Sequence, residues 1–158
     1  MSLVQSHMMA LGTKAPSFTL PDTVTGKTVT LSEMKSDVAT VIAFICNHCT
    51  FVHHINHQLV KVANEFQAKG VQFITISSND TDYYPQDGPE MMKRVAENLD
   101  YSFPYLYDET QKVALNYKAE CTPDFFVFNG NLELAYRGRF DETRPNLGTA
   151  TGLSLIHI

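Results

Sequence analysis

The sequence predicts an α/β domain built on a central mixed β-sheet that is flanked by helices. Two β-rich apolar runs, 38–45 and 71–77, enclose an amphipathic segment, which is the pattern of a right-handed parallel βαβ unit. The chain then ends in two β-rich runs joined by a turn signal, which indicates antiparallel strands. Its 158 residues match one domain of roughly 150 residues, and a hydrophobic content of 44% is enough for one core.

The first half of the chain predicts a hairpin, a buried strand and a helix. Residues 15–22 and 26–31 alternate apolar and polar side chains around a turn-rich middle, so we expect an N-terminal β-hairpin. The run 38–45 shows no clear alternation, which suits a strand buried on both faces of a sheet. From 49 to 69 apolar residues recur at helical spacing until Gly70 ends the run, and this stripe consists of Val52, Ile55, Leu59, Val62 and Phe66.

The second half begins with a polar, turn-rich loop over 78–89, which is long enough to suggest a function. The elements that we expect after it are a helix, a strand, a short helix and two strands, over 90–99, 103–107, 109–117, 124–128 and 132–137. Asn129-Gly130 lies between the last two and is a strong signal for a two-residue hairpin turn.

Charge and hydropathy exclude two classes of partner. The net charge is −5 and no run of Lys or Arg reaches three residues, so the electrostatic attraction that drives nucleic-acid binding is missing. The longest apolar stretch, 38–45, is less than half of the roughly 20 residues that a membrane-spanning helix needs. We therefore expect neither nucleic acid nor a membrane as a partner.

The two ends differ in character from the rest of the chain. Residues 1–11 have neither a basic start nor a continuous apolar stretch, so we interpret them as an expression leader and expect a cytoplasmic protein. The domain itself is predicted over 12–150. The tail 151–158 carries no charged side chain, and we treat it as a segment that need not be native.

Two of the three cysteines form the sequence Cys46-Asn47-His48-Cys49, called the CNHC motif below, at the predicted strand-to-helix turn. Such a pair can form and break a disulfide within one turn, and a helix N-terminus stabilises a thiolate. We expect Cys46 to have a lowered pKa, to attack a substrate disulfide, and to be released when Cys49 attacks it in turn. A cationic His48 would further favour the thiolate over the disulfide.

A metal site is the alternative interpretation of this motif. Cys-x-x-Cys is also half of a zinc knuckle, but no second such pair completes four ligands. His53 and His57 have the spacing of a metal-binding pair, yet with His54 they fall opposite the apolar stripe, so we expect a solvated helix face. A copper or zinc module that uses Cys46, Cys49 and a nearby His remains open.

The third cysteine belongs to Cys121-Thr122-Pro123, directly before the predicted strand 124–128. Proline cannot donate to a sheet ladder, so it belongs at the beginning or edge of the strand, where an X-Pro bond can be cis. Cys121 is either a third redox thiol or a small buried residue, and we favour the second role because it is the commoner one for cysteines outside disulfides.

Together these segments resemble the thioredoxin-like superfamily, and within it the branch of alkyl hydroperoxide reductase/thiol-specific antioxidant-like (redoxin) proteins. The resemblance extends from Gly12 to about Gly148, and its segments are 15–21, 44–52, 78–80, 121–128 and 136–139. It implies a thioredoxin-like fold with an N-terminal β-hairpin and a central insertion. It also implies Cys46 as nucleophile, Cys49 as resolving thiol, and Pro123 as a cis-proline that faces them. The backbone of Thr122 would pair with an extended substrate segment.

The chain departs from two subgroups of that superfamily. Thioredoxins proper have Trp-Cys-Gly-Pro-Cys, whereas this chain has no Trp and has Ile45 in that place. The buried carboxylate six residues before the first cysteine is Thr40 here, so we expect the proton acceptor for the resolving thiol to be His48, Glu120 or water.

Peroxiredoxins require a proline and a hydroxyl before their reactive cysteine, and this chain has Ala39 and Ala43 at those positions. Arg137 or Arg139 would have to supply a guanidinium to such a site. A thiol-dependent peroxidase that uses Cys46 is therefore kept as an alternative function.

We predict a thiol-disulfide oxidoreductase that exchanges a Cys46/Cys49 dithiol or disulfide with protein disulfides or small thiols, and with a dithiol electron donor. Asn47, His48, Thr122, Pro123 and Cys121 are the expected supporting residues. No cofactor and no resident metal are expected. An antioxidant role in cell redox homeostasis follows from the same resemblance.

Overall fold

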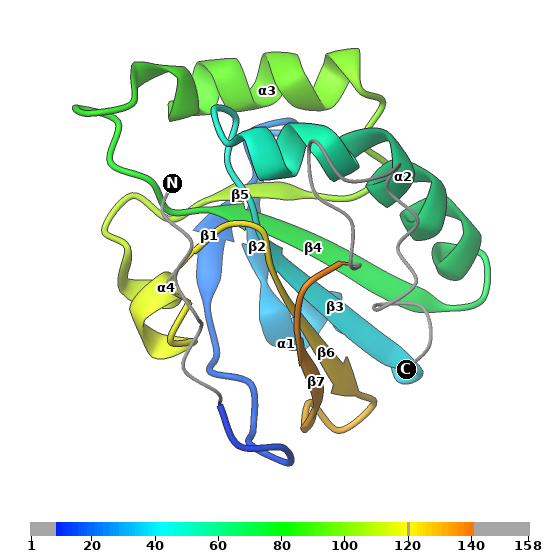
Figure 1. Ribbon diagram of the computed structural model, residues 1–158. Coiled ribbons are helices and arrows are strands. Elements are labelled where there is room, and N and C mark those ends of the chain that lie inside the picture. Colours follow the sequence, from blue (N-terminus) through cyan, green and yellow to red (C-terminus); the bar gives the residue numbers. More distant parts are fainter. Residues whose placement is uncertain (1–8, 120, 141–158) are drawn as a thin grey trace.

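A five-stranded mixed sheet forms the centre of the computed structural model, which describes residues 9–119 and 121–140 (Figure 1). The strand order is β5-β4-β3-β6-β7. Strands β3, β4 and β5 are parallel, whereas β6 runs antiparallel to β3, and β7 antiparallel to β6. The strand bounds are Ala39–Phe44 for β3, Val71–Ser77 for β4, Tyr105–Tyr107 for β5, Asp124–Asn129 for β6 and Leu134–Gly138 for β7. This architecture confirms the predicted mixed α/β class.

Helices cover both faces of this sheet (Figure 1). On one face lie α2 (Thr50–Gln67) and α3 (Pro89–Asn98), whose apolar residues form the first core cluster with the sheet. Residues of α1 (Leu31–Met34) and α4 (Lys112–Asn116) belong to the second core cluster, on the opposite face. A 3-10 helix, η1 (Pro85–Asp87), precedes α3 directly.

The central strand β3 confirms the prediction of a strand buried on both faces. Its side chains alternate between the two clusters, so that Val41 and Ala43 pack toward α2 while Ile42 and Phe44 pack into the second cluster. Successive side chains of a strand point to opposite faces of a sheet. A strand covered on both sides therefore needs apolar residues at every position, which explains the missing alternation.

Helix α2 confirms the predicted amphipathic helix within two residues at its C-terminal end. Four members of its apolar stripe, Val52, Ile55, Leu59 and Val62, are buried. His53 and His57 are exposed on the other side, as the helical wheel predicted. The chain leaves the helix through Gly70 at φ +92, a conformation that glycine adopts without the steric cost of a Cβ.

The N-terminal hairpin is present as β1 (Thr19–Pro21) and β2 (Thr28–Thr30), which pair antiparallel. It is joined to the central sheet where Asp22 forms an isolated bridge with Leu106 of β5. The hairpin confirms the expectation from residues 15–31.

The turn between β6 and β7 corrects one prediction. Asn129 is the last residue of β6, so the connection is longer than two residues and Asn129-Gly130 does not form its centre. Leu132 instead adopts the left-handed conformation, with φ +59, and its N–H bonds to the Asn129 carbonyl. Gly130 is required for another reason, since a Cβ there would lie 2.1 Å from the Asp37 carbonyl oxygen.

Some expectations fall outside the described residues. These are residues 1–8 of the predicted leader, Glu120, and the predicted tail 151–158. Met9, at the end of the predicted leader, is buried in the second core cluster. In the part of the chain that the structure describes, no helix has the length and apolar character needed to cross a membrane.

Candidate active site

The CNHC motif connects the carboxyl end of β3 to the start of α2. Cys49 is the N-cap residue of α2, and Cys46 follows the strand by two residues. Cys46 is 1% exposed and Cys49 is 3% exposed. The two cysteines lie 4.2 Å apart and are not joined by a disulfide. The structure thus shows a buried, reduced dithiol.

Thr122 and Pro123 lie against this dithiol, as the resemblance implies. The Thr122–Pro123 peptide bond is cis. The Thr122 hydroxyl oxygen is 3.3 Å from Cys46 Sγ, and Cys49 Sγ donates to the Thr122 carbonyl oxygen at 3.4 Å. One residue therefore contacts both thiols, with its hydroxyl at Cys46 and its carbonyl at Cys49.

Cys121 occupies a different environment from the other two cysteines. It is half-buried and is not in a disulfide. It lines a cavity of about 220 Å³ together with Thr122, Asn79 and Phe44. Its redox role stays a prediction.

Asn47 is held by residues from two distant segments. Its backbone N–H donates to Asp87 Oδ1 at 2.7 Å, and its side-chain amide donates to the Gln86 carbonyl at 2.6 Å. The Tyr105 hydroxyl donates to Asn47 Oδ1 at 2.9 Å. Because a buried amide needs its hydrogen bonds satisfied, these contacts fix the turn between the two cysteines.

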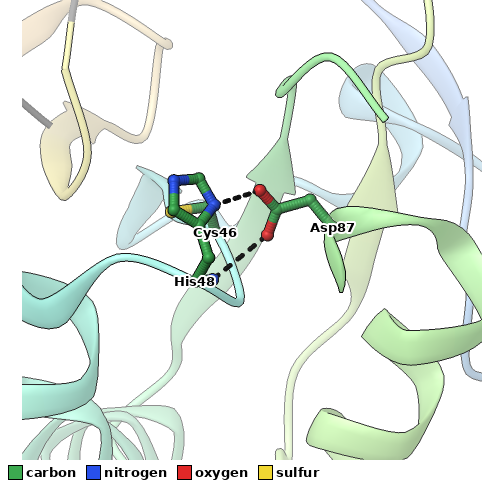
Figure 2. Close-up of side chains that lie close together, drawn as sticks. All are labelled: Cys46, His48 and Asp87. Atoms are coloured by element: carbon green, nitrogen blue, oxygen red, sulfur yellow. Dashed lines mark hydrogen bonds and ion pairs between the residues drawn. The ribbon is translucent and has the colours of Figure 1, made fainter. Parts of the chain in front are cut away.

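His48 is bound by the same carboxylate (Figure 2). Its Nδ1 contacts Asp87 Oδ2, and its backbone N–H donates to Asp87 Oδ1 at 3.2 Å. The ring stacks on Tyr84, with centroids 4.1 Å apart and planes inclined by 5°. Asn79 Nδ2 donates to Asp87 Oδ2 at 3.0 Å. The 78–89 loop therefore holds the imidazole from two sides.

One of the three histidines expected on the solvated helix face also contacts the motif. A ring nitrogen of His53 bonds to the Asn47 carbonyl, although the residue as a whole is exposed. The helical wheel correctly predicted the exposure, but a wheel contains no information on the turn that precedes the helix.

The charge distribution of the dithiol corrects our expectation for Cys46. A hydrogen bond with Cys49 and burial raise the pKa of Cys46, and the charges of Cys49 and Asp87 raise it further. The hydrogen bond from Cys46 lowers the pKa of Cys49 to about 5, helped by the N–H groups of Val52 and Phe51. We had expected the thiolate on Cys46. Because the first turn of α2 lies directly after Cys49, the helix N-terminus stabilises an anion there instead.

Two phenols adjoin the site without supplying charge to it. Burial raises the pKa of Tyr101 and that of Tyr105 well above the usual value for tyrosine. Both side chains are therefore neutral around physiological pH, and Tyr105 acts as a hydrogen-bond donor to Asn47.

A metal ion would need donor atoms that converge. In residues 9–119 and 121–140 the only group of three with this property is Cys46, His48 and Asp87, whose donor atoms lie within 4.8 Å of one another. Cys49 is not part of the group, so the predicted ligand set of both cysteines and a histidine is not assembled. The His48 and Asp87 atoms contact each other directly, and Asp87 also accepts three N–H donors.

Residues considered for other chemistries are engaged elsewhere. Arg137 is buried in an ion pair with Asp124, with 2.9 Å between Nη2 and Oδ2, and it also donates to the Lys118 carbonyl. Both of these contacts are made by Nη2, and the Asp124 carboxylate already balances the charge of the guanidinium. Thr40 is fully buried and its hydroxyl accepts the Ser36 N–H at 3.0 Å. A neutral hydroxyl does not take up a proton as the carboxylate of thioredoxins does.

The sequence pattern does not identify Asp87, Tyr84 and Asn79 as parts of the site. All three belong to the polar loop over 78–89, whose length suggested a function but not which side chains carry it. A single aspartate before Gly-Pro is an ordinary loop residue in sequence, and only its burial in the structure distinguishes it.

Comparisons with known proteins agree with this geometry. A family model described as the AhpC/TSA family matches residues 11–137. An uncharacterised conserved protein from Geobacillus kaustophilus is 54% identical, with a TM-score of 0.96, over 99% of this chain and 83% of that one. A hypothetical protein from Sinorhizobium meliloti is 40% identical, with a TM-score of 0.92, over 96% of this chain and 83% of that one.

A more distant structure shares the fold. The thioredoxin domain of a thiol-disulfide oxidoreductase from Bacteroides vulgatus is 19% identical, with a TM-score of 0.72, over 95% of this chain and 98% of that one. No curated protein matches the chain. The family match covers most of the chain. The chain belongs to the AhpC/TSA family, in the redoxin branch of the thioredoxin-like superfamily.

Proposed function

We propose that the protein is a thiol-disulfide oxidoreductase whose reactive group is the Cys46/Cys49 pair. The observation that carries the proposal is the reduced dithiol at the end of β3, with Thr122 in contact with both sulfurs. A buried Cys-x-x-Cys pair that can close into a disulfide is suited to two-electron exchange with another disulfide. The fold shared with the thioredoxin domain of the Bacteroides vulgatus oxidoreductase supports the same chemistry.

The reaction proceeds through two exchanges. The Cys46 thiolate attacks one sulfur of the partner disulfide, so that a mixed disulfide forms while the partner's own S–S bond breaks. The departing sulfur leaves as a thiolate and takes up a proton. Cys49 then attacks Cys46 Sγ, which forms the Cys46–Cys49 disulfide and releases the second partner sulfur. The cysteine pair gives two electrons, and the two released partner sulfurs take up one proton from Cys46 and one from the solvent.

Thr122 supports Cys46 as the attacking residue. Its hydroxyl, 3.3 Å from Cys46 Sγ, can donate to a thiolate there and lowers the pKa of Cys46 against the effects that raise it. Its carbonyl oxygen lies 3.4 Å from Cys49 Sγ, so the same residue contacts the attacking sulfur and the resolving sulfur. The partners that fit this arrangement are protein disulfides in extended segments and small disulfides.

Trapping of the mixed disulfide tests the proposal. The purified chain and the variants Cys46→Ser, Cys49→Ser and Cys121→Ser are incubated with insulin as a model protein disulfide, and adducts are identified by mass spectrometry. We expect the wild type and Cys121→Ser to reduce insulin, and Cys49→Ser to stop at an adduct through Cys46. An adduct formed by Cys46→Ser instead would reverse the two roles. Absence of reduction by the wild type, with no adduct in any variant, would refute the function.

A further inference from the structure

The Asp87 carboxylate is fully buried and lies at the CNHC motif rather than in solvent. It accepts N–H donors from Asn47, His48 and Asn79 and contacts Nδ1 of the His48 ring. A buried carboxylate is costly unless it is paired and hydrogen-bonded, and this one has both kinds of partner. The other buried aspartates have partners elsewhere in the fold. Asp22 accepts the Val24 N–H, Asp108 accepts the Ala114 N–H of α4, and Asp124 pairs with Arg137.

The contacts of His48 select one form of its ring. With Nδ1 against a carboxylate, the neutral imidazole carries its proton on Nδ1 and leaves the lone pair on Nε2. The stacking on Tyr84 holds the plane of the ring, and the side chain is 15% exposed. His48 is thus oriented by Asp87 in the way that a carboxylate orients a catalytic histidine.

The attack of Cys46 requires a group that accepts its thiol proton. Burial and the hydrogen bond with Cys49 leave the proton on Cys46, whereas the thiolate is the nucleophile. Thr40 holds no charge, and the phenols of Tyr101 and Tyr105 are neutral donors. The Cys49 thiolate accepts the hydrogen bond of Cys46, but a proton passed to Cys49 would have to leave again before Cys49 attacks in the second exchange. The donor atoms of Cys46, His48 and Asp87 lie within 4.8 Å of one another, a separation that one water can bridge between the thiol and the ring.

We propose that His48, positioned by Asp87 from the 78–89 loop, is the acid–base group of the dithiol. This inference rests on the proposed function and names the group that moves its protons. Nε2 takes the proton of Cys46 as that sulfur attacks the partner disulfide, and the resulting imidazolium is stabilised by the Asp87 carboxylate. The same proton passes to the partner sulfur that leaves, so His48 returns to its neutral form.

The groups around His48 define what else could produce a pH dependence. Asp87 faces it from η1, Tyr84 from the 78–89 loop, and the thiol of Cys46 from its own turn. Tyr101 and Tyr105 face the Cys46 side and do not titrate near neutral pH. The comparison of His48→Asn with wild type therefore separates the contribution of the ring from that of the thiols.

The test measures the rate at which the pre-reduced chain reduces the aromatic disulfide dithiobis-nitrobenzoate at a series of pH values. The variants are His48→Asn and Asp87→Asn, with His57→Asn and Asp82→Asn as controls, because those two side chains are exposed on α2 and in the 78–89 loop. Near neutral pH we expect a loss of about 100-fold for His48→Asn and about 10-fold for Asp87→Asn. Both losses should shrink as rising pH ionises the thiol without help.

Several results would overturn the inference. One is a His48→Asn rate within twofold of wild type at every pH, and another is an equal loss at every pH, which indicates a structural role only. If Asp87→Asn does not fold, the pH profile of His48→Asn still tests the inference. That variant keeps Asp87, which continues to accept the backbone N–H groups of the motif. Stoichiometric zinc or copper in the purified wild type, absent from both variants, would assign the group to a metal. A wild type that reduces no disulfide refutes the proposed function itself.

Discussion

The backbone N–H of Asn47 donates to Asp87 Oδ1 at 2.7 Å, which joins the turn between the two cysteines to a loop forty residues further along the chain. The same carboxylate receives the His48 N–H and contacts its ring. The loop is therefore a structural part of the dithiol site, since it determines the orientation of both residues between the cysteines.

The ionisation of the dithiol gives a first prediction. Because the pKa of Cys49 is about 5 and that of Cys46 is raised, the reduced protein should carry one thiolate from neutral pH down to about pH 5. A lowered pKa means that the anion persists in acid, so the thiolate absorbance should disappear only as the pH falls through that value. The measurement is an ultraviolet titration of reduced against oxidised protein. Cys121→Ser should leave the curve unchanged, and a midpoint near the ordinary cysteine value of about 8.5 would contradict the assignment.

The hydrogen bond from Tyr105 to Asn47 gives a second prediction. Tyr105→Phe removes the hydroxyl that donates to the buried Asn47 Oδ1, and we expect a loss of about 1–3 kcal/mol in the free energy of unfolding. Urea denaturation of the reduced protein measures it. Tyr83→Phe is the matched control, because that side chain is 81% exposed and should change stability little. Equal midpoints for both variants would show that the Tyr105 hydroxyl does not support the motif.

The ion pair of Arg137 and Asp124 gives a third prediction. Both side chains are at most 1% exposed, and Arg137 also lies over the Phe126 ring at 4.8 Å. Asp124→Asn leaves a buried guanidinium without its counter-charge, and we expect a loss of about 3–5 kcal/mol in unfolding free energy.

The control for this pair is Glu65→Gln, which breaks the largely exposed pair with Lys69 and should cost less than about 1 kcal/mol. Similar denaturation midpoints for Asp124→Asn and Glu65→Gln would mean that the buried pair contributes no more than a surface pair.

The reaction with hydrogen peroxide gives a fourth prediction and separates the peroxidase alternative. Cys46 has Ala39 and Ala43 where a peroxidase site needs a proline and a hydroxyl, and Arg137 is engaged with Asp124. We expect the reduced chain to consume hydrogen peroxide no faster than free cysteine does. Rapid consumption that Cys46→Ser abolishes would establish the peroxidase activity instead.

Much of the fold could be predicted from local pattern. The stripe of α2 and the continuous apolar run of β3 follow directly from periods of 3.6 and of 2, because burial on one or both faces determines which side chains must be apolar. The dithiol could be predicted because its two cysteines are close in sequence. The β6–β7 turn was mispredicted, since close approach of the Asp37 carbonyl, not turn geometry, requires Gly130.

The sequence by itself determined the mixed α/β class and the place of the CNHC motif between β3 and α2, whereas the contact of that motif with Thr122 and Pro123 was implied by the family resemblance. Tertiary structure alone decided that Asp87 is buried against His48 and that the helix N-terminus favours the thiolate on Cys49. The physical reason is that periodicity and spacing encode contacts within an element, whereas the charge on a group depends on what other segments bring to it. The conformation of the 78–89 loop carries that information, and no repeat in the sequence encodes it.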